Sequence, residues 1–371
     1  MKVHDMRLSF LWNSTNLYLL EHAEAPFATV ANRAAYVDRF EQVRAGVPDS
    51  AGFLPPWPQQ GRQLFWRTYL ERRDPTTITG EQAWRALVPL RTKPKITIES
   101  PVAGATVKLH VFIFPFGFTV VVDVTCWPAS PLEFDAAIEF AHEIRRTTRF
   151  NISGLAGPLA HVTLDGLAEV VRGAVRTQIY GGQPQADEIV GDAYSVTTFV
   201  RLEGADTTTP VADQGEVHRA LHAVTTWSPT YSVDALKPLQ DARVETRTAP
   251  ASHLLYAQKC GRAVWFPFTA DVQRRGISLA CYHRNQVFAA LQVESLSMLI
   301  NETERRIHSG EPISARHDSL ARSAAGILGR MYGGDQSTYR TGSVRQHLVY
   351  NKCIDALDVV RDRYSMPKII R

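Results

Sequence analysis

The chain has 371 residues, of which 44% are hydrophobic and 21% are charged, and its formal net charge is +4. This composition is typical of a folded globular protein, and the length predicts two or three folding units rather than one core. The modest positive charge does not favour a dedicated nucleic-acid-binding protein.

The sequence also argues against membrane, export and metal-binding classes. A polar break at 13–16 is unlike the apolar core of a signal peptide, and the most apolar stretch, 111–124, is too short for a span of about 20 residues. The cysteines lie far apart without a C-x-x-C pair, so we expect free thiols and neither a disulfide nor a zinc framework. They are Cys126, Cys260, Cys281 and Cys353. We therefore expect a cytoplasmic protein without a metal or cofactor.

In the first half, alternation of apolar and polar residues predicts a strand at 3–12. Residues 108–127 are rich in β-branched and aromatic side chains on both sides of a Pro-Phe-Gly hinge, which predicts a hairpin. Pro131 begins a helix that ends near Arg146. The remaining expected elements are helices at 29–45 and between 63 and 90, separated by a loop at 48–61.

A Gly-Gly-Gln-Pro turn at 181–184 predicts a domain boundary. Beyond it, the apolar spacing predicts strands at 194–202, 253–268 and 277–282 and helices at 214–227, 285–308, 315–331 and 343–364.

Together these elements predict an α+β protein. We expect two sheet-plus-helix modules, 1–180 and 186–310, each with helices on one face, followed by a C-terminal helical extension at 311–371. The order of elements is ferredoxin-like and recurs in both modules, so a diverged duplication is a hypothesis.

Several residues are candidates for chemistry. His161-Val162-Thr163 matches one H-x-[ST] arm of the two-histidine phosphoesterases, but the only other match, His317-Asp318-Ser319, lies in a predicted helix. The stretch around Cys260 partly matches that of a caspase nucleophile, although a buried strand position explains this cysteine more simply. A surface or half-buried histidine without a catalytic role is likewise the favoured interpretation of His161.

The segment 281–285, Cys-Tyr-His-Arg-Asn, is expected to join a strand to a long helix, with Asn285 as the N-cap. Functional groups are often displayed at such junctions, so His283 and Arg284 are the first candidates for a ligand or partner contact. A simple cap that faces solvent is the alternative.

The tail is basic, with twelve Lys/Arg against six Asp/Glu between 305 and 371. Glycines at 326, 329, 333 and 334 near Arg330 and Arg340 allow an anion-binding loop, but a helix that ends at Gly333 is favoured. Nucleic acid binding through Arg330, Arg340, Arg345 and Lys352 is a further alternative.

Three regions, LHVFIFPFGFTVVVDVT with PLEFDAAIEFAHEIRR, RAVWFPF and LACYHRNQVFAALQVESL, resemble actinobacterial conflict-system proteins that are associated with caspase/TPR-repeat effectors. The resemblance implies an antiviral defence component that contacts a protein partner, such as a caspase-like protease, or forms a homo-oligomer. It carries over no catalytic residue. The leading hypothesis is therefore a non-catalytic sensor or scaffold. A phosphoesterase or hydrolase using His161, His283 or Cys260 is the enzymatic alternative, and alanine at those positions distinguishes the two.

Overall fold

The structure is a computed structural model, and it describes part of the chain. The described residues are 2–16, 95–99, 105–114, 116–126, 128, 130–153, 158–180, 188–202, 221, 223–227, 254–258, 261–268, 279–333, 348 and 353–367.

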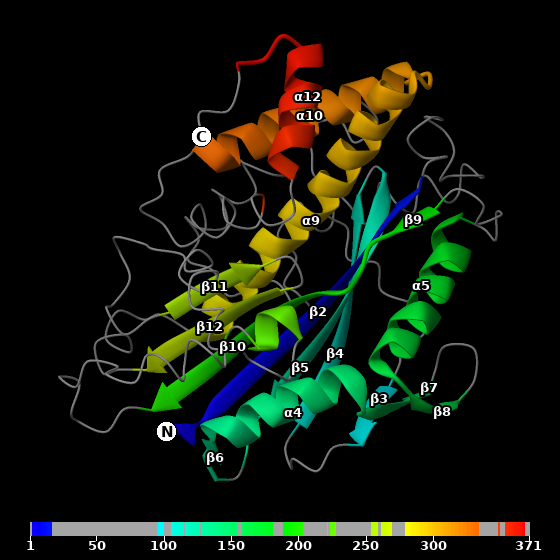
Figure 1. Cartoon of the computed structure of the whole chain (residues 1–371). Coiled ribbons are helices and arrows are strands. Elements are labelled where there is room, and N and C mark those ends of the chain that lie inside the picture. The colour runs from blue at the N-terminus through cyan, green and yellow to red at the C-terminus, as the bar shows by residue number, and fades with distance from the viewer. Residues whose placement is uncertain are drawn as a thin grey trace, which may run out of the picture.

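The centre of the protein is a seven-stranded sheet in the order β11-β12-β10-β2-β5-β4, with β9 paired to β2 (Figure 1). Only the β10–β12 pairing among these strands is parallel. The strands are β2 (Asp5–Asn16), β4 (Ala105–Phe114), β5 (Gly117–Cys126), β9 (Glu188–Val190), β10 (Tyr194–Leu202), β11 (Leu254–Gln258) and β12 (Gly261–Phe268).

Helices cover both faces of this sheet. On one face, alternate residues of β2 such as Leu8 and Phe10 pack with α4 (Phe134–Arg146) and α5 (Leu164–Tyr180). On the other face, Leu11 and its neighbours pack with the helices α9 (Leu279–Ser309), α10 (Ala315–Gly333) and α12 (Cys353–Arg363). The near-continuous burial of β5 has the same cause, because a strand covered on both faces has no solvent side.

Two smaller sheets lie beside the main one. β1 (Lys2–Val3) pairs with β6 (Leu132–Glu133). A three-stranded antiparallel sheet has the order β3-β7-β8, and its strands are β3 (Lys95–Glu99), β7 (Arg149–Ser153) and β8 (Leu159–Val162).

The C-terminal helices form one packed unit on the sheet. They are α9 (Leu279–Ser309), α10 (Ala315–Gly333) and α12 (Cys353–Arg363). α9 ends at Gly310, whose φ of +69° is a left-handed conformation that glycine adopts without steric cost. Figure 1 shows α10 and α12 at the end of α9 that lies away from β11 and β12.

The structure confirms the α+β class and several predicted elements. The hairpin at 108–127 is β4 and β5, the strand at 194–202 is β10, and the helix at 315–331 is α10, which ends at Gly333 as expected. The first strand is longer than 3–12, because Ser14 and Thr15 pair with both β5 and β9.

The junction predicted at 281–285 is wrong. α9 begins at Leu279, so residues 279–282 are helical rather than strand and Asn285 lies inside the helix instead of capping it. A short apolar run fits a buried helix as well as a strand, and burial of His283, Val287, Ala290 and Leu291 continues at helical spacing into this segment.

The expectation of two sheets with helices on one face each is also corrected. Strands from both sides of the turn at 181–184 share the seven-stranded sheet, whose two faces both carry helices. The module boundaries and the duplication remain predictions. The elements expected at 29–45, 48–61 and 63–90 lie outside the described residues.

Candidate functional site

Four polar side chains meet between α9 and the middle of the sheet. They come from four elements: Ser9 of β2, Asp123 of β5, Thr198 of β10 and His283 of α9. Ser9 and Asp123 are direct cross-strand partners, and Thr198 pairs with the residue two positions before Ser9. The sheet register therefore places three polar groups beneath one helix position.

The side chains of this cluster are almost completely buried. Ser9 and Thr198 are fully buried, and His283 is 1% exposed. The side chain of Asp123 retains 15% exposure. Buried polar groups are costly unless they are hydrogen bonded, so the partners of each atom decide what the cluster can do.

An ionised Asp123 accepts hydrogen bonds only, and this sets the direction of the contacts in the cluster. The Ser9 hydroxyl donates to Oδ1 of Asp123 at 2.7 Å. Because Ser9 has one proton to give, Nε2 of His283, 2.8 Å away, donates to Ser9 Oγ. Nδ1 of a neutral ring then accepts the hydroxyl proton of Thr198, also at 2.8 Å.

This order of groups differs from that of a hydrolase triad. In such a triad the imidazole lies between the serine and the carboxylate and accepts the serine proton. Here Ser9 lies between His283 and Asp123, and its proton points to the carboxylate. Nε2 carries a hydrogen, so it is not a base toward Ser9. The arrangement instead anchors α9 to three strands.

The other predicted contact residues are placed only in part. The backbones of Arg284 and Asn285 lie in α9 and that of Arg330 lies in α10. The predicted residues outside the described part of the chain are Cys260, Arg340, Arg345 and Lys352.

His161 lies on β8 of the three-stranded sheet and does not belong to this cluster. Its side chain is 73% exposed and its Nδ1 is 3.2 Å from the Glu99 carboxylate. Thr163, which would complete the H-x-[ST] arm, accepts the amide proton of Gly166 at the start of α5. The other match, His317, is fully buried in α10, so the structure does not bring two such arms together.

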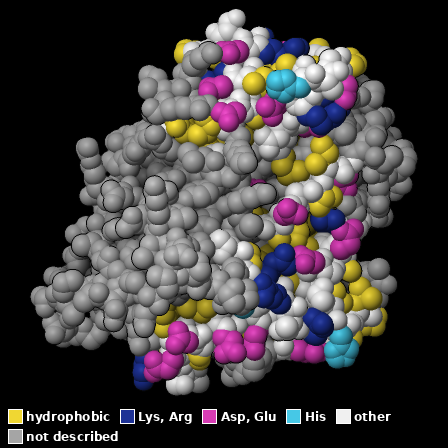
Figure 2. Space-filling model, viewed as in Figure 1, with side chains coloured by type: hydrophobic (Ala, Val, Ile, Leu, Met, Phe, Trp, Pro, Cys, Tyr) yellow, Lys and Arg dark blue, Asp and Glu magenta, His cyan; other side chains and the backbone are white. Residues whose placement is uncertain are grey.

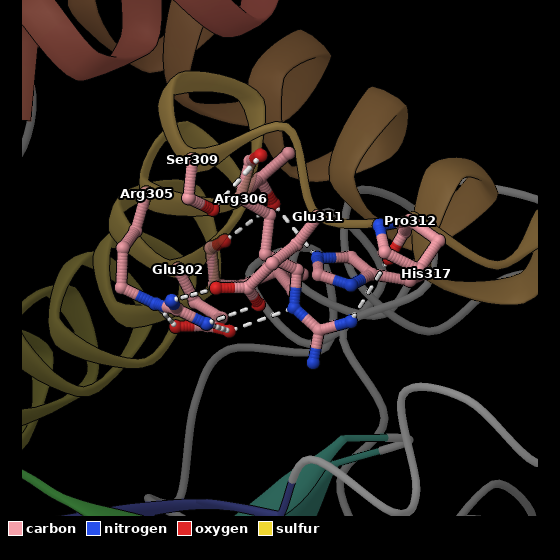
Figure 3. A network of polar contacts seen from close by, with 9 residues as sticks. Glu302, Arg305, Arg306, Ser309, Glu311, Pro312 and His317 are labelled. Carbon is pink, nitrogen blue, oxygen red and sulfur yellow. Dashed lines mark hydrogen bonds and ion pairs between the residues drawn. The ribbon is translucent and has the colours of Figure 1, made fainter.

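A second polar network joins α9 to α10 (Figure 3). Glu302 is 4% exposed and accepts hydrogen bonds from Arg305 and Arg306, each as short as 2.8 Å. Arg306 is itself only 6% exposed. Nε2 of His317 lies 2.9 Å from the Thr303 hydroxyl. Sequence reasoning missed this network, although a Glu four residues before an Arg on a helix is a recognisable signal.

The basic tail is held by intramolecular contacts. Arg363 and the Tyr364 hydroxyl donate to Asp318 of α10. Arg361 donates to the Ala325 carbonyl beside Gly329, where a Cβ atom would lie 1.9 Å from its guanidinium. On the face that Figure 2 shows, acidic and basic side chains are intermixed at this end of the molecule.

Two of the four predicted free thiols are confirmed as buried. Burial raises the pKa of Cys126 to about 11 and that of Cys353 to about 12. Cys260 and the side chain of Cys281 lie outside the described residues.

Within the described part of the chain, no three His, Cys, Asp or Glu side chains are grouped as a metal site would require. None of the described helices is long and apolar enough to cross a membrane. Comparison of the chain with protein-family models, curated proteins and solved structures gives no match.

Proposed function

We propose that the protein is a non-catalytic interaction component, a sensor or scaffold, of a bacterial defence system that binds or regulates a caspase-like effector. The proposal that the protein is non-catalytic rests on the hydrogen bonding of His283. Both of its ring nitrogens are bonded to buried hydroxyls, which supports a structural role for this residue, one of the three catalytic candidates of the sequence.

The identity of the partner rests on the sequence resemblance alone. On the face that Figure 2 shows, the described parts of α9, α10 and α12 carry side chains of both charge signs, which does not favour the nucleic-acid alternative. Arg305 and Arg363 pair with Glu302, Glu311 and Asp318. Such pairing reduces the positive charge available to a nucleic acid.

The first experiment is coexpression of the full chain with its native gene neighbours, among which the proposal expects a caspase-like protease, followed by size-exclusion chromatography with light scattering. A peak heavier than the 41.4 kDa chain that contains the protease supports the proposal. A heavier peak with the chain alone supports only self-association. A monomer that leaves the protease in a separate peak contradicts the proposal.

His161→Ala distinguishes an interaction protein from the hydrolase alternative. This side chain is exposed, so its loss should leave the fold and the complex intact. His283→Ala is not suitable for this purpose, since it empties a buried hydrogen-bonded position. Retention of nucleic acid on the column, with affinity that falls steeply as salt rises, would favour the nucleic-acid alternative instead.

A further inference from the structure

One corner of the three-stranded sheet carries a closed ring of hydrogen bonds. Each strand contributes one side chain: Glu99 of β3, Asn151 of β7 and His161 of β8. The Asn151 amide donates to Glu99 at 2.7 Å and its Oδ1 accepts the backbone N–H of His161 at 3.0 Å. Nδ1 of His161 completes the ring at 3.2 Å from the Glu99 carboxylate.

These hydrogen bonds fix the tautomer of the His161 imidazole. The hydrogen bond from Asn151, together with the charges of His161 and Arg149, holds the pKa of Glu99 below its ordinary value despite some desolvation. Glu99 is therefore an ionised acceptor at neutral pH, and Nδ1 must donate to it. In the neutral imidazole, Nε2 then carries a lone pair on a side chain that is 73% exposed.

The backbone at this position is also unusual. His161 has a φ of +56°, a left-handed conformation that is uncommon for residues other than glycine. It lies where the pairing of β7 and β8 shifts register between Phe150 and Ile152. Strained positions persist when surrounding contacts hold them, and they are frequent at functional sites.

We propose that Nε2 of His161 is a phosphoryl-accepting nucleophile, a modification site that takes a phosphoryl group from a high-energy donor such as an acyl phosphate. The Nε2 lone pair attacks phosphorus, and the bond from phosphorus to the leaving group breaks and takes its electron pair with the leaving group. The ring becomes cationic until Nδ1 releases its proton to solvent.

Glu99 is the positioning residue for this step. Its carboxylate faces the Nδ1–H on which positive charge develops, and it orients the ring so that Nε2 is open. Arg149, the cross-strand partner of Glu99, adds a guanidinium beside the dyad that favours an anionic donor. This charge distinguishes a phosphoryl donor from a neutral electrophile.

His308 on α9 is a matched internal control. Its side chain is 66% exposed, close to the value for His161, and it also has a carboxylate neighbour. However, it is Nε2 of His308 that faces Glu304, at 3.6 Å. The two histidines thus differ in which ring nitrogen faces a carboxylate: Nδ1 in His161 and Nε2 in His308.

The test is reaction of the purified full chain with potassium phosphoramidate at neutral pH, with phosphohistidine located by peptide mass spectrometry. This step breaks the P–N bond and releases ammonia. We expect His161 to react about tenfold faster than His308, and Glu99→Gln to remove most of that advantage without changing the rate at His308. His161→Gln identifies the modified peptide.

Equal rates at His161 and His308, or an unchanged His161 rate in folded Glu99→Gln, would overturn the proposal. If Glu99→Gln does not fold, the comparison of the two histidines in the wild-type chain decides it. Diethylpyrocarbonate, a neutral electrophile, is used in parallel. Faster reaction of His161 with that reagent alone would show a nucleophile that is not suited to phosphoryl transfer. Neither reaction uses a partner protein, so the outcome is independent of the proposed function.

Discussion

The Ser9 hydroxyl on β2 lies 2.8 Å from Nε2 of His283 on α9, although 274 positions separate the two residues in the chain. The contact joins the first long strand to the first C-terminal helix in the centre of the main sheet. It also engages Nε2 of His283, one of the candidate residues of the sequence analysis. Its role should therefore be visible in stability rather than in turnover.

Replacement of Ser9 by alanine should destabilise the fold. The change leaves Asp123 and Nε2 of His283 without a shared hydroxyl in a buried position. Loss of a partner by buried polar groups costs about 1–3 kcal/mol, and we expect a decrease of that size in the free energy of unfolding. Urea titration followed by circular dichroism measures it.

Ser309→Ala is the matched control for this prediction. Ser309 is exposed at the end of α9, and its hydroxyl makes a 3.3 Å contact with the Arg306 carbonyl. Its removal should change the free energy of unfolding by less than about 0.5 kcal/mol. Equal effects of the two variants would mean that the buried cluster does not hold α9 to the sheet.

Glu302→Gln should destabilise the junction of α9 and α10 strongly. Glu302 and Arg306 form an ion pair at 2.8 Å in which both side chains are buried. Removal of this charge takes from the buried guanidinium its ion-pair partner at 2.8 Å, and breaking a buried pair in this way costs about 3–5 kcal/mol. Glu311→Gln is the control, because Glu311 pairs with the exposed Arg305, and the urea midpoint of that variant should stay close to wild type.

The ionisation of Glu302 should also make the free energy of unfolding depend on pH. Burial opposes ionisation of Glu302, but the hydrogen bonds and charges of Arg305 and Arg306 outweigh it and hold its pKa below the ordinary 4.5. The unfolded state thus binds this proton more tightly than the folded state. The contribution of Glu302 is complete above pH 4.5 and is lost as the pH falls through the folded-state pKa.

Unfolding of wild type and Glu302→Gln is compared between neutral pH and about pH 3 to test this. The difference in free energy between the two proteins should shrink as the solution is acidified below 4.5. Other groups titrate equally in both, so they cancel. A constant difference over this range would contradict the assigned pKa direction.

The sequence predicted those strands and helices whose residue pattern is local, within one element and its adjoining turn. The hairpin at 108–127 carries strand-forming residues on both sides of a turn. The helix that follows was predicted to begin at Pro131, but α4 begins at Phe134, after β6 (Leu132–Glu133), and ends at Arg146 as expected. The first residues of α9 were harder to predict, because the residues from Leu279 to Tyr282 are apolar and fit either a strand or a buried helix. Only packing against the sheet decides between them.

The polar clusters could not be predicted in the same way. Ser9, Asp123 and Thr198 meet because of strand register, which depends on pairing between distant segments. His161 was identified as a candidate from its motif, but its partner Glu99 lies 62 positions earlier and belongs to no motif. The pair Glu302 and Arg306, in contrast, has i,i+4 spacing and was readable from the sequence.

Cys126 and Cys353 should be unreactive in the folded protein. Burial raises the pKa of Cys126 to about 11, with Asp5 adding to the effect, and that of Cys353 to about 12. Because the thiolate is the reactive form, both thiols should resist iodoacetamide at about pH 8 and react once the chain is unfolded in urea. Peptide mass spectrometry distinguishes these cysteines from Cys260 and Cys281.

The position of any labelling identifies the part of the fold that opens. Cys353 packs with α9 and α10, whereas Cys126 lies in the core on the opposite face of the sheet. Labelling of Cys353 alone in the native protein would mean that α12 detaches while the sheet stays folded. Rapid labelling of Cys126 would contradict the burial of β5. Protection of both is expected if the C-terminal helices and the sheet form one stable unit.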